Sequence, residues 1–362
     1  MKKFIMLLSL AAMVLFASAC LEDLFSSDDE EEEEQNQELV GVWYRFVLTK
    51  GGLSYGLPAY VELRNDGTGT INSIDEPEQD EPASDTFKWL TVGDTITIND
   101  ENDSLVWTGN FTLSDDKKGV HFAYTSEGQL VEEVYVKYTG EKNPQLLGTW
   151  VMVDLQVGGE EPLILETITF TQSGGTDYFI DDLENIEGEI TAEHLNVTGF
   201  VWTTSGHYLM VFDDTEELPF VMGYTLNDDQ FNGYDYTDDG KREDFILVKE
   251  TGSIDQDGVG TWQLASMKIN GMTNPIPGLD IALSLASDGS GVWNIVSFSQ
   301  SYNFNWTTNS GYVLIYQAEL PLIAWVQKYE IAGDTMVLET DTEYYEGYGG
   351  WVNVEYTFTR SQ

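Results

Sequence analysis

From residue 39 onward, hydrophobic and polar residues alternate with a period of two along much of the chain. Ile96 and Ile98 show the alternation in one segment, and Tyr356 and Phe358 show it in another. Such alternation is typical of β-strands with one buried face. Asp-Gly, Gly-Asp and Asn-Asp clusters separate the strands, as turns require. No segment after residue 38 shows a helical period, so the sequence predicts an all-β protein.

The alternating pattern occurs three times, and each copy carries the same five landmarks in the same order. They are a G-x-W triplet, a turn, an F-x-W strand, a hairpin turn and a last strand with one basic residue. The G-x-W tryptophans are Trp43, Trp150 and Trp262, the F-x-W tryptophans are Trp89, Trp202 and Trp306, and the last-strand basic residues are Lys137, Lys249 and Arg360. Each basic residue follows the first tryptophan of its copy by 94, 99 or 98 residues, which argues against an accidental match.

The repeats predict three domains, at residues 39–142, 143–250 and 251–362. A copy of about 105 residues has room for seven to nine short antiparallel strands, which favours a closed barrel over a sheet with exposed edges. In a closed barrel the first and last strands are neighbours, so the G-x-W tryptophan and the last-strand cation of each copy can meet. A cation over an indole ring contributes about 0.5 to 2 kcal/mol. We therefore expect these six residues to form structural seams that close the barrels.

The combination of a first-strand G-x-W, a last-strand basic residue and an all-β repeat between them resembles the lipocalin and calycin barrels. It is most similar to the small lipocalin-like domains of bacterial lipoproteins, in three tandem copies. The resemblance implies up-and-down barrels whose mouth can hold a small hydrophobic molecule. It also implies that the tryptophan and the basic residue lie at the closed end, where they support the fold. The copies are shorter than a typical lipocalin and lack its second and third motifs, so the ligand-binding residues stay unknown.

The first 38 residues have a different composition from the repeats. Lys2 and Lys3 precede a stretch of 13 apolar residues and the small residues Ala17 to Ala19, which predicts a signal peptide over residues 1–19. The run from Phe16 to Cys20 resembles the lipobox of bacterial lipoproteins, whose cysteine is lipidated and becomes the mature N-terminus. Residues 20–38 include seven consecutive acids and predict an extended acidic tether. The resemblance implies a lipid-anchored protein of the cell envelope, at the periplasmic face of the outer membrane or at the cell surface.

The charge of the chain narrows the choice of partners. Asp and Glu number 63 against 16 Lys and Arg, which gives a formal net charge of -47. Nucleic acid requires a basic footprint, so nucleic-acid binding is excluded as a main role. Anionic lipid headgroups do not attract such a surface, so we expect membrane contact only through the lipid anchor. The single cysteine excludes an internal disulfide.

Three segments or residue sets partly match chemical motifs, but none fits the repeat pattern. The segment from Gly52 to Gly56 matches the G-x-S-x-G nucleophile elbow, but that motif works between a parallel strand and a helix. The segment from Asp235 to Gly240 partly resembles a calcium loop, yet its twelfth position is Ile246, which cannot bind calcium. A zinc cluster of Cys and His is excluded because no second cysteine accompanies the histidines, which are His121, His194 and His207. We therefore expect no catalytic residue, no metal and no cofactor.

Two functions are compatible with these sequence features. The first is a non-enzymatic envelope protein that holds a small hydrophobic ligand in one or more barrels. The alternative is an interaction or structural protein whose filled barrels act as a spacer or as a platform for a protein or a glycan. An eight-stranded barrel is just wide enough to be filled by side chains or to hold one small ligand, so its size is compatible with both functions.

Overall fold

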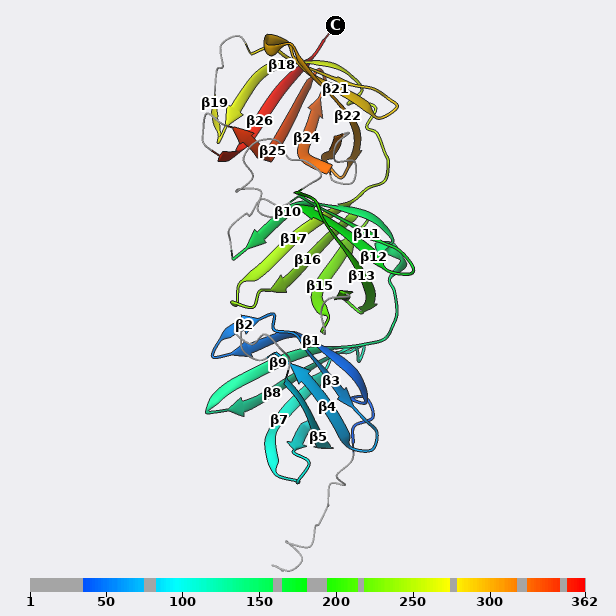
Figure 1. Cartoon of the computed structure of the whole chain (residues 1–362), viewed down its shortest axis with the longest axis vertical. Helices are drawn as coiled ribbons and strands as arrows, with labels where there is room; N and C mark the ends of the chain where they lie inside the picture. Colours follow the sequence, from blue (N-terminus) through cyan, green and yellow to red (C-terminus); the bar gives the residue numbers. More distant parts are fainter. Residues whose placement is uncertain are drawn as a thin grey trace, which may run out of the picture.

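The computed structural model describes residues 35–74, 83–158, 165–180, 194–213, 218–273, 279–317, 324–345 and 350–361. The predicted signal peptide, Cys20 and most of the predicted tether lie outside the described residues. Figure 1 shows three β-barrels stacked along the longest axis of the molecule. Within the described ranges, no helix is long and apolar enough to cross a membrane.

Barrel 1 is closed by its first and last strands. Its strands are β1 (Gly41–Lys50), β2 (Leu53–Tyr55), β3 (Ala59–Leu63), β4 (Thr68–Ser73), β5 (Ala83–Val92), β6 (Thr95–Asn99), β7 (Leu105–Leu113), β8 (Gly119–Ser126) and β9 (Gln129–Lys137). Strands β1 and β3 to β9 pair in chain order, and β1 also pairs with β9. Strand β2 extends β1 as a short side hairpin.

Barrels 2 and 3 repeat this arrangement. Barrel 2 consists of β10 (Gly148–Val157), β11 (Leu165–Phe170), β12 (Gly175–Ile180), β13 (Asn196–Ser205), β14 (Tyr208–Asp213), β15 (Phe220–Asn227), β16 (Gln230–Tyr236) and β17 (Arg242–Lys249). Barrel 3 consists of β18 (Gly260–Ile269), the side strand β19 (Met272–Thr273), β20 (Ile281–Leu285), β21 (Ser290–Ile295), β22 (Gln300–Asn309), β23 (Tyr312–Gln317), β24 (Ala324–Ala332), β25 (Thr335–Tyr345) and β26 (Gly350–Arg360). The antiparallel pairings β10–β17 and β18–β26 close the two barrels. The predicted fold of three antiparallel up-and-down barrels is confirmed.

The period-two pattern explains these strands. Burial alternates residue by residue along β3, β16 and β20, because successive side chains point into and out of the barrel. The first strand of each barrel interrupts the alternation with a β-bulge at the same distance from its tryptophan, between Arg45 and Val47, between Met152 and Asp154, or between Leu264 and Ser266. A bulge bends its strand and increases the local twist, as closure of a small barrel requires.

Each barrel has two different ends. We call the end that holds the G-x-W tryptophan the closed end and the opposite end the open end. Strands β2 and β19, which extend β1 and β18 at the open ends, both lie on the left side of the stack in Figure 1. The open ends of barrels 1 and 3 therefore face the same side of the molecule.

Barrels 1 and 2 meet through outward-facing aromatic residues. The ring of Phe46 lies 5.1 Å from that of Tyr208 and 5.5 Å from that of Tyr234, measured between centroids. Met210, on the outer face of β14, is fully buried in the same cluster. The segment that links the two barrels is also attached to barrel 2, because the Glu141 carbonyl accepts a hydrogen bond of 2.7 Å from the Thr204 amide of β13.

Barrels 2 and 3 meet through a smaller cluster. Val151, Val248 and Leu314 are fully buried there, although all three point away from the barrel interiors. The Glu250 carboxylate accepts hydrogen bonds from the hydroxyl groups of Thr307 and Tyr316, which ties the link to barrel 3. Apolar packing and linker hydrogen bonds together fix each barrel against the next.

Candidate functional site

The structure brings together the G-x-W tryptophan and the last-strand cation in all three barrels. Trp43 is the register partner of Lys137, Trp150 of Lys249 and Trp262 of Arg360. The Lys Nζ atoms lie 5.1 Å and 5.2 Å from the indole centroids of barrels 1 and 2, and Arg360 Cζ lies 4.2 Å from that of barrel 3. These distances are those of cation–π contacts.

Backbone hydrogen bonds complete each seam. The indole N–H groups of Trp43, Trp150 and Trp262 donate to the carbonyls of Leu39, Leu146 and Gly258 at 2.7 to 2.8 Å, four residues earlier in each case. Lys137 and Lys249 each donate one hydrogen bond of 3.0 Å to a carbonyl of the same entering segment, whereas Arg360 donates two, of 2.8 and 2.6 Å. The seam therefore stabilises both the pairing of the first and last strands and the position of the segment that enters the barrel.

The glycine of each G-x-W triplet is required by the seam geometry. Gly41, Gly148 and Gly260 have φ angles of 142°, 121° and 147°, a region that side chains rarely adopt. A Cβ atom at these positions would lie 2.9 to 3.0 Å from the side chain of the seam cation. The backbone conformation therefore favours glycine, and any side chain at these positions would also displace the end of the seam cation.

A second tryptophan fixes the turn that follows the seam. Trp89 Nε1 donates to the carbonyls of Arg64 and Thr68, and Trp202 and Trp306 make the same pair of contacts with the turns of their own barrels. The phenylalanine of each F-x-W strand lies over a glycine across the sheet, in the pairs Phe87–Gly69, Phe200–Gly175 and Phe304–Gly291. These landmarks repeat because they form one packing unit in each barrel.

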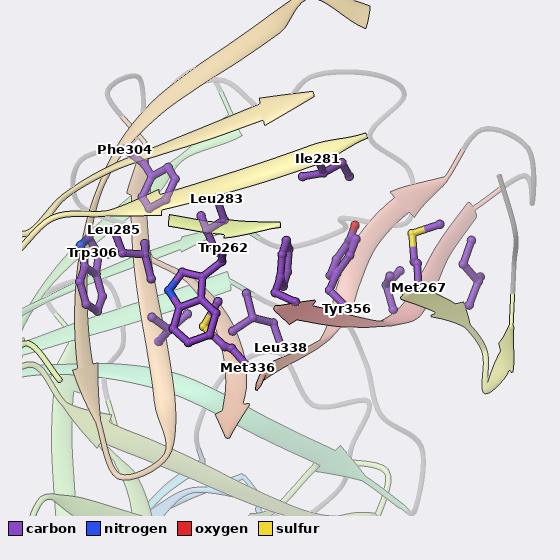
Figure 2. Packing of buried hydrophobic residues seen from close by; sticks show 14 of the residues in the cluster. Trp262, Met267, Ile281, Leu283, Leu285, Phe304, Trp306, Met336, Leu338 and Tyr356 are labelled. Atoms are coloured by element: carbon purple, nitrogen blue, oxygen red, sulfur yellow. The ribbon is translucent and has the colours of Figure 1, made fainter. Parts of the chain in front are cut away.

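The interior of barrel 3 is closely packed and mostly apolar. Figure 2 shows Trp262, Phe304 and Trp306 in its core together with aliphatic side chains. The space that the centre of a water molecule can reach in the cavity beside Trp306 is about 10 Å³. A single water needs about that much space, so this cavity is far too small for a lipid or a pigment.

The interior of barrel 1 contains an ion pair. Arg45 Nη1 lies 2.7 Å from Glu133 Oε1, and both side chains are almost completely buried. Glu133 also accepts hydrogen bonds from the hydroxyl groups of Tyr124 and Tyr135. Arg45 donates further hydrogen bonds to backbone carbonyls, including that of Leu57 at 2.8 Å. The ion pair of Arg45 and Glu133 occupies the interior of barrel 1 above the seam. The hydrogen bond from Arg45 to the Leu57 carbonyl also attaches the loop after β2 to strand β1.

The open half of barrel 2 is acidic. Asp177 is the register partner of the core residue Ile168, and Glu166 lies two residues before Ile168 on the same face. Asp235 is the register partner of Glu243, which lies two residues before the core residue Phe245. All four carboxyl groups therefore face the interior. Burial, followed by the charges of Asp177 and Glu243, raises the pKa of Glu166 to about 8.

Ser54 of the G-x-S-x-G segment and His121 lie outside the barrel interiors. Ser54 Oγ lies 2.9 Å from Thr49 Oγ1 within the β1–β2 hairpin. His121 lies on the wall of barrel 1, with Nε2 3.4 Å from Glu132 Oε1. Among the residues that the structure describes, no group of three or more His, Cys, Asp and Glu side chains can hold a metal ion. Asp235, the first residue of the partial calcium loop, belongs to β16 and faces the barrel interior.

Sequence reasoning missed the acidic interior of barrel 2 and the ion pair of barrel 1. The abundance of carboxylates concealed both, because some pairs are expected to approach by chance. The positions of these charged residues within their strands could have revealed that they face the interior. Glu166 alternates in phase with Ile168 and Phe170, and Arg45 stands two residues after an inward tryptophan. A charged residue in phase with core residues is costly unless it has a role or a partner.

Comparisons with known proteins leave the family of the chain open. No protein-family model and no curated protein matches it. Among solved structures, a mutant of the vaccine antigen transferrin binding protein B from Haemophilus parasuis shares 7% identity over 84% of this chain and 66% of its own, with a TM-score of 0.21. The chain thus spans slightly less than two thirds of that protein.

Two further structures are similarly distant. Transferrin binding protein B from Neisseria meningitidis shares 11% identity over 86% of this chain and 67% of its own, with a TM-score of 0.20. A protein of unknown function from the DUF3598 family of Nostoc punctiforme shares 10% identity over 90% of this chain and 97% of its own, with a TM-score of 0.19. At these TM-scores the likenesses carry no argument about function.

Proposed function

We propose that the chain is a non-enzymatic interaction protein of the cell envelope, anchored by lipid at Cys20 and built as a rigid rod of three barrels. The observation that carries this proposal is the packing between successive barrels. Met210 at one junction and Leu314 at the other are fully buried although they lie on outer barrel faces. Buried apolar contacts and tied linkers suit a spacer or a platform, in which the relative position of the domains has to be kept.

The packed interiors of barrels 1 and 3 support the same proposal. The ion pair of Arg45 and Glu133 occupies barrel 1, and the cavity near Trp306 in barrel 3 admits about one water molecule. Barrels filled in this way resist deformation, because closely packed interiors have low compressibility.

The open end of barrel 3 offers a surface for a protein or glycan partner. Val296 and Phe298 lie in the short 3-10 helix η4 (Val296–Phe298), and Tyr302 lies on the adjoining strand β22. Their exposed fractions are 53%, 65% and 53%. Exposed apolar side chains gathered in one place are typical of interaction sites.

Small-angle X-ray scattering tests the rod, with the full chain carrying Cys20→Ala so that lipid micelles do not contribute. We expect a single elongated particle whose maximum dimension does not change with salt. A distribution of dimensions typical of flexibly linked domains would contradict the proposal. Fractionation tests the anchor separately: the unaltered chain should be recovered with membranes and the Cys20→Ala chain in the soluble fraction.

A small hydrophobic ligand is the second candidate function, because the cavity of barrel 3 has an apolar lining, although its present volume admits only about one water molecule. The residues around its cavity, including Leu283, Val313 and Met336, present almost no polar atoms to a ligand. Native mass spectrometry of the full chain before and after organic extraction tests this candidate. A mass that extraction lowers would favour ligand binding, whereas an unchanged mass would favour the filled spacer.

A further inference from the structure

The open half of barrel 2 places two pairs of acidic groups on one wall of its interior. Glu166 on β11 and Asp177 on β12 form one pair, and Asp235 on β16 and Glu243 on β17 form the other. Strand β10 separates β11 from β17, and its inward residue nearest the second pair is Val157, the register partner of Glu243. The two carboxyl pairs therefore lie on the same wall with an apolar strip between them.

On the described segments, the other side chains that face this half are apolar, polar and uncharged, or acidic. They are Leu155 on β10, Phe179 on β12, Asn196 and Thr198 on β13, Asp213 on β14 and Phe220 on β15, and His194 stands at the rim two residues before Asn196. The basic residues nearest in sequence point elsewhere, since Lys241 pairs with Asp239 and Arg242 with Asp244. Lys249 faces the interior at the closed end, over Trp150. On the described strands, no Lys or Arg side chain faces the open half.

Two buried carboxyl oxygens in this half have no hydrogen-bond partner among the described residues. Asp235 is 3% exposed, and among the described residues its Oδ1 atom has no hydrogen-bond partner. Asp177 Oδ1 is buried and lacks a partner in the same way. A buried carboxyl oxygen without a donor is unfavourable, so a group that donates hydrogen bonds and carries positive charge would stabilise this arrangement.

We propose that the open half of barrel 2 binds a small organic cation with two ammonium groups, one for each carboxyl pair. An ammonium group has three N–H donors and a full positive charge, which match the acceptor atoms of Asp177 and Asp235. A methylene chain between two ammonium groups suits the apolar strip at Val157. A compact metal ion fits less well, because within the described residues no three carboxyl or imidazole groups converge closely enough to hold one.

The bound cation would replace protons. Burial and the neighbouring Glu243 carboxyl raise the pKa of Asp235 to about 8, and burial raises that of Asp177 to about 7. The free site therefore holds protons at neutral pH. A diammonium ligand has to displace them, so its binding should release protons and become stronger as the pH rises from about 6 to about 8.5, where alkyl ammonium groups are still charged.

Isothermal titration of the full chain in detergent tests the proposal, with 1,4-diaminobutane as the probe. Butane-1,4-diol, which has the same length and no charge, is the control ligand. At about 0.15 M salt, where interactions of exposed charges are screened, we expect one saturable site per chain for the diamine and no heat of binding for the diol. Absence of a saturable site, or equal binding of the diol, would overturn the proposal.

Two double variants with the same change in charge distinguish diamine binding in the interior from binding to the acidic surface. Asp235→Asn with Glu243→Gln removes two interior charges, and Asp228→Asn with Asp238→Asn removes two charges from exposed turns of the same barrel. Loss of charged hydrogen bonds should weaken diamine binding at least about tenfold in the interior variant. The surface variant should stay within about twofold of the unaltered chain. Equal losses in both variants would assign the binding to diffuse surface charge.

Proton release tests the site without a variant. Titration in two buffers with different ionisation heats should show protons released when the diamine binds at about pH 7.5. Binding without proton release would overturn the interior site even if the interior variant failed to fold. Saturable binding of calcium at the same carboxyl groups, with no diamine binding, would also overturn it.

Discussion

Arg45 and Glu133 form an ion pair of 2.7 Å in the interior of barrel 1, whereas the same repeat positions are apolar or aromatic in the other two barrels. The corresponding pairs are Met152 with Phe245 in barrel 2 and Leu264 with Tyr356 in barrel 3. The three barrels thus share their closed ends and differ in the interior above them. Replacement of a buried ion pair by apolar residues of similar volume is often tolerated, whereas removal of one partner is not.

The contribution of the ion pair to the stability of barrel 1 can be measured by introducing the residues that barrel 2 has at the same repeat positions. Arg45→Met should lower the free energy of unfolding by about 3 to 5 kcal/mol, because it leaves Glu133 buried without its partner. Arg45→Met combined with Glu133→Phe should lose less than the single change. Urea unfolding of the full chain, followed by hydrogen exchange of β1 and β9, measures both. A double variant less stable than the single one would show that Glu133 finds other partners.

The seam cations predict a second set of effects. Lys249→Met removes a cation–π contact and a hydrogen bond to the Gln145 carbonyl, and should cost about 0.5 to 2 kcal/mol. Arg360→Met should cost more, because Arg360 lies nearer to its indole ring and donates two backbone hydrogen bonds. Lys241→Met is the control, since its exposed pair with Asp239 is worth about 0 to 1 kcal/mol. A loss at Lys241 equal to that at Lys249 would show that the change in net charge, and not the seam, is being measured.

Barrel 2 should lose stability as the pH rises. The pKa values of Glu166 and Asp235 are raised to about 8 in the folded chain, against ordinary values near 4. The folded state then binds more protons than the unfolded state between these limits, so the stability that these two groups contribute is fully present below about pH 4 and is lost as the pH rises through about 8.

Hydrogen exchange of β11 and β16 measures this pH dependence for barrel 2 alone. Glu166→Gln should flatten the fall, because a neutral amide has no proton to lose. Asp228→Asn, in an exposed turn of the same barrel, should leave the slope unchanged. A slope that Glu166→Gln does not alter would assign the pH dependence to other groups.

The fold could be predicted from the sequence because closure depends on local, repeated features. The G-x-W glycine, its tryptophan and the last-strand cation are fixed by backbone geometry and by one cross-strand pairing, so they recur in the same order and at similar spacing in all three copies. The interfaces between barrels depend on which outward residues the bulges expose, and neither Phe46 nor Met210 differs in sequence pattern from a core residue. Interior acids such as Asp235 and Glu133 follow no repeat, since the equivalent positions of the other barrels do not carry an acid.

The junction between barrels 1 and 2 gives a final prediction about rigidity. Phe46 is 7% exposed and packs on Tyr208, Tyr234 and Tyr236 of barrel 2. Phe46→Ala should lower the free energy of unfolding by about 3 kcal/mol, because it removes a buried ring and leaves a cavity at the junction. Phe298→Ala, at a ring that is 65% exposed, should change it by less than about 0.5 kcal/mol.

The same two variants distinguish an effect on the rigidity of the junction from an effect on the stability of the fold. Small-angle scattering below the unfolding transition should give a broader distribution of dimensions for Phe46→Ala than for Phe298→Ala, since the first change weakens the contact between barrels while the seams of both stay intact. If Phe46→Ala lowered the stability without broadening the distribution, the linker hydrogen bond between Glu141 and Thr204 would be sufficient to hold the barrels in line. If it did neither, the junction would contribute nothing to the rod, and the spacer proposal would lose the observation that carries it.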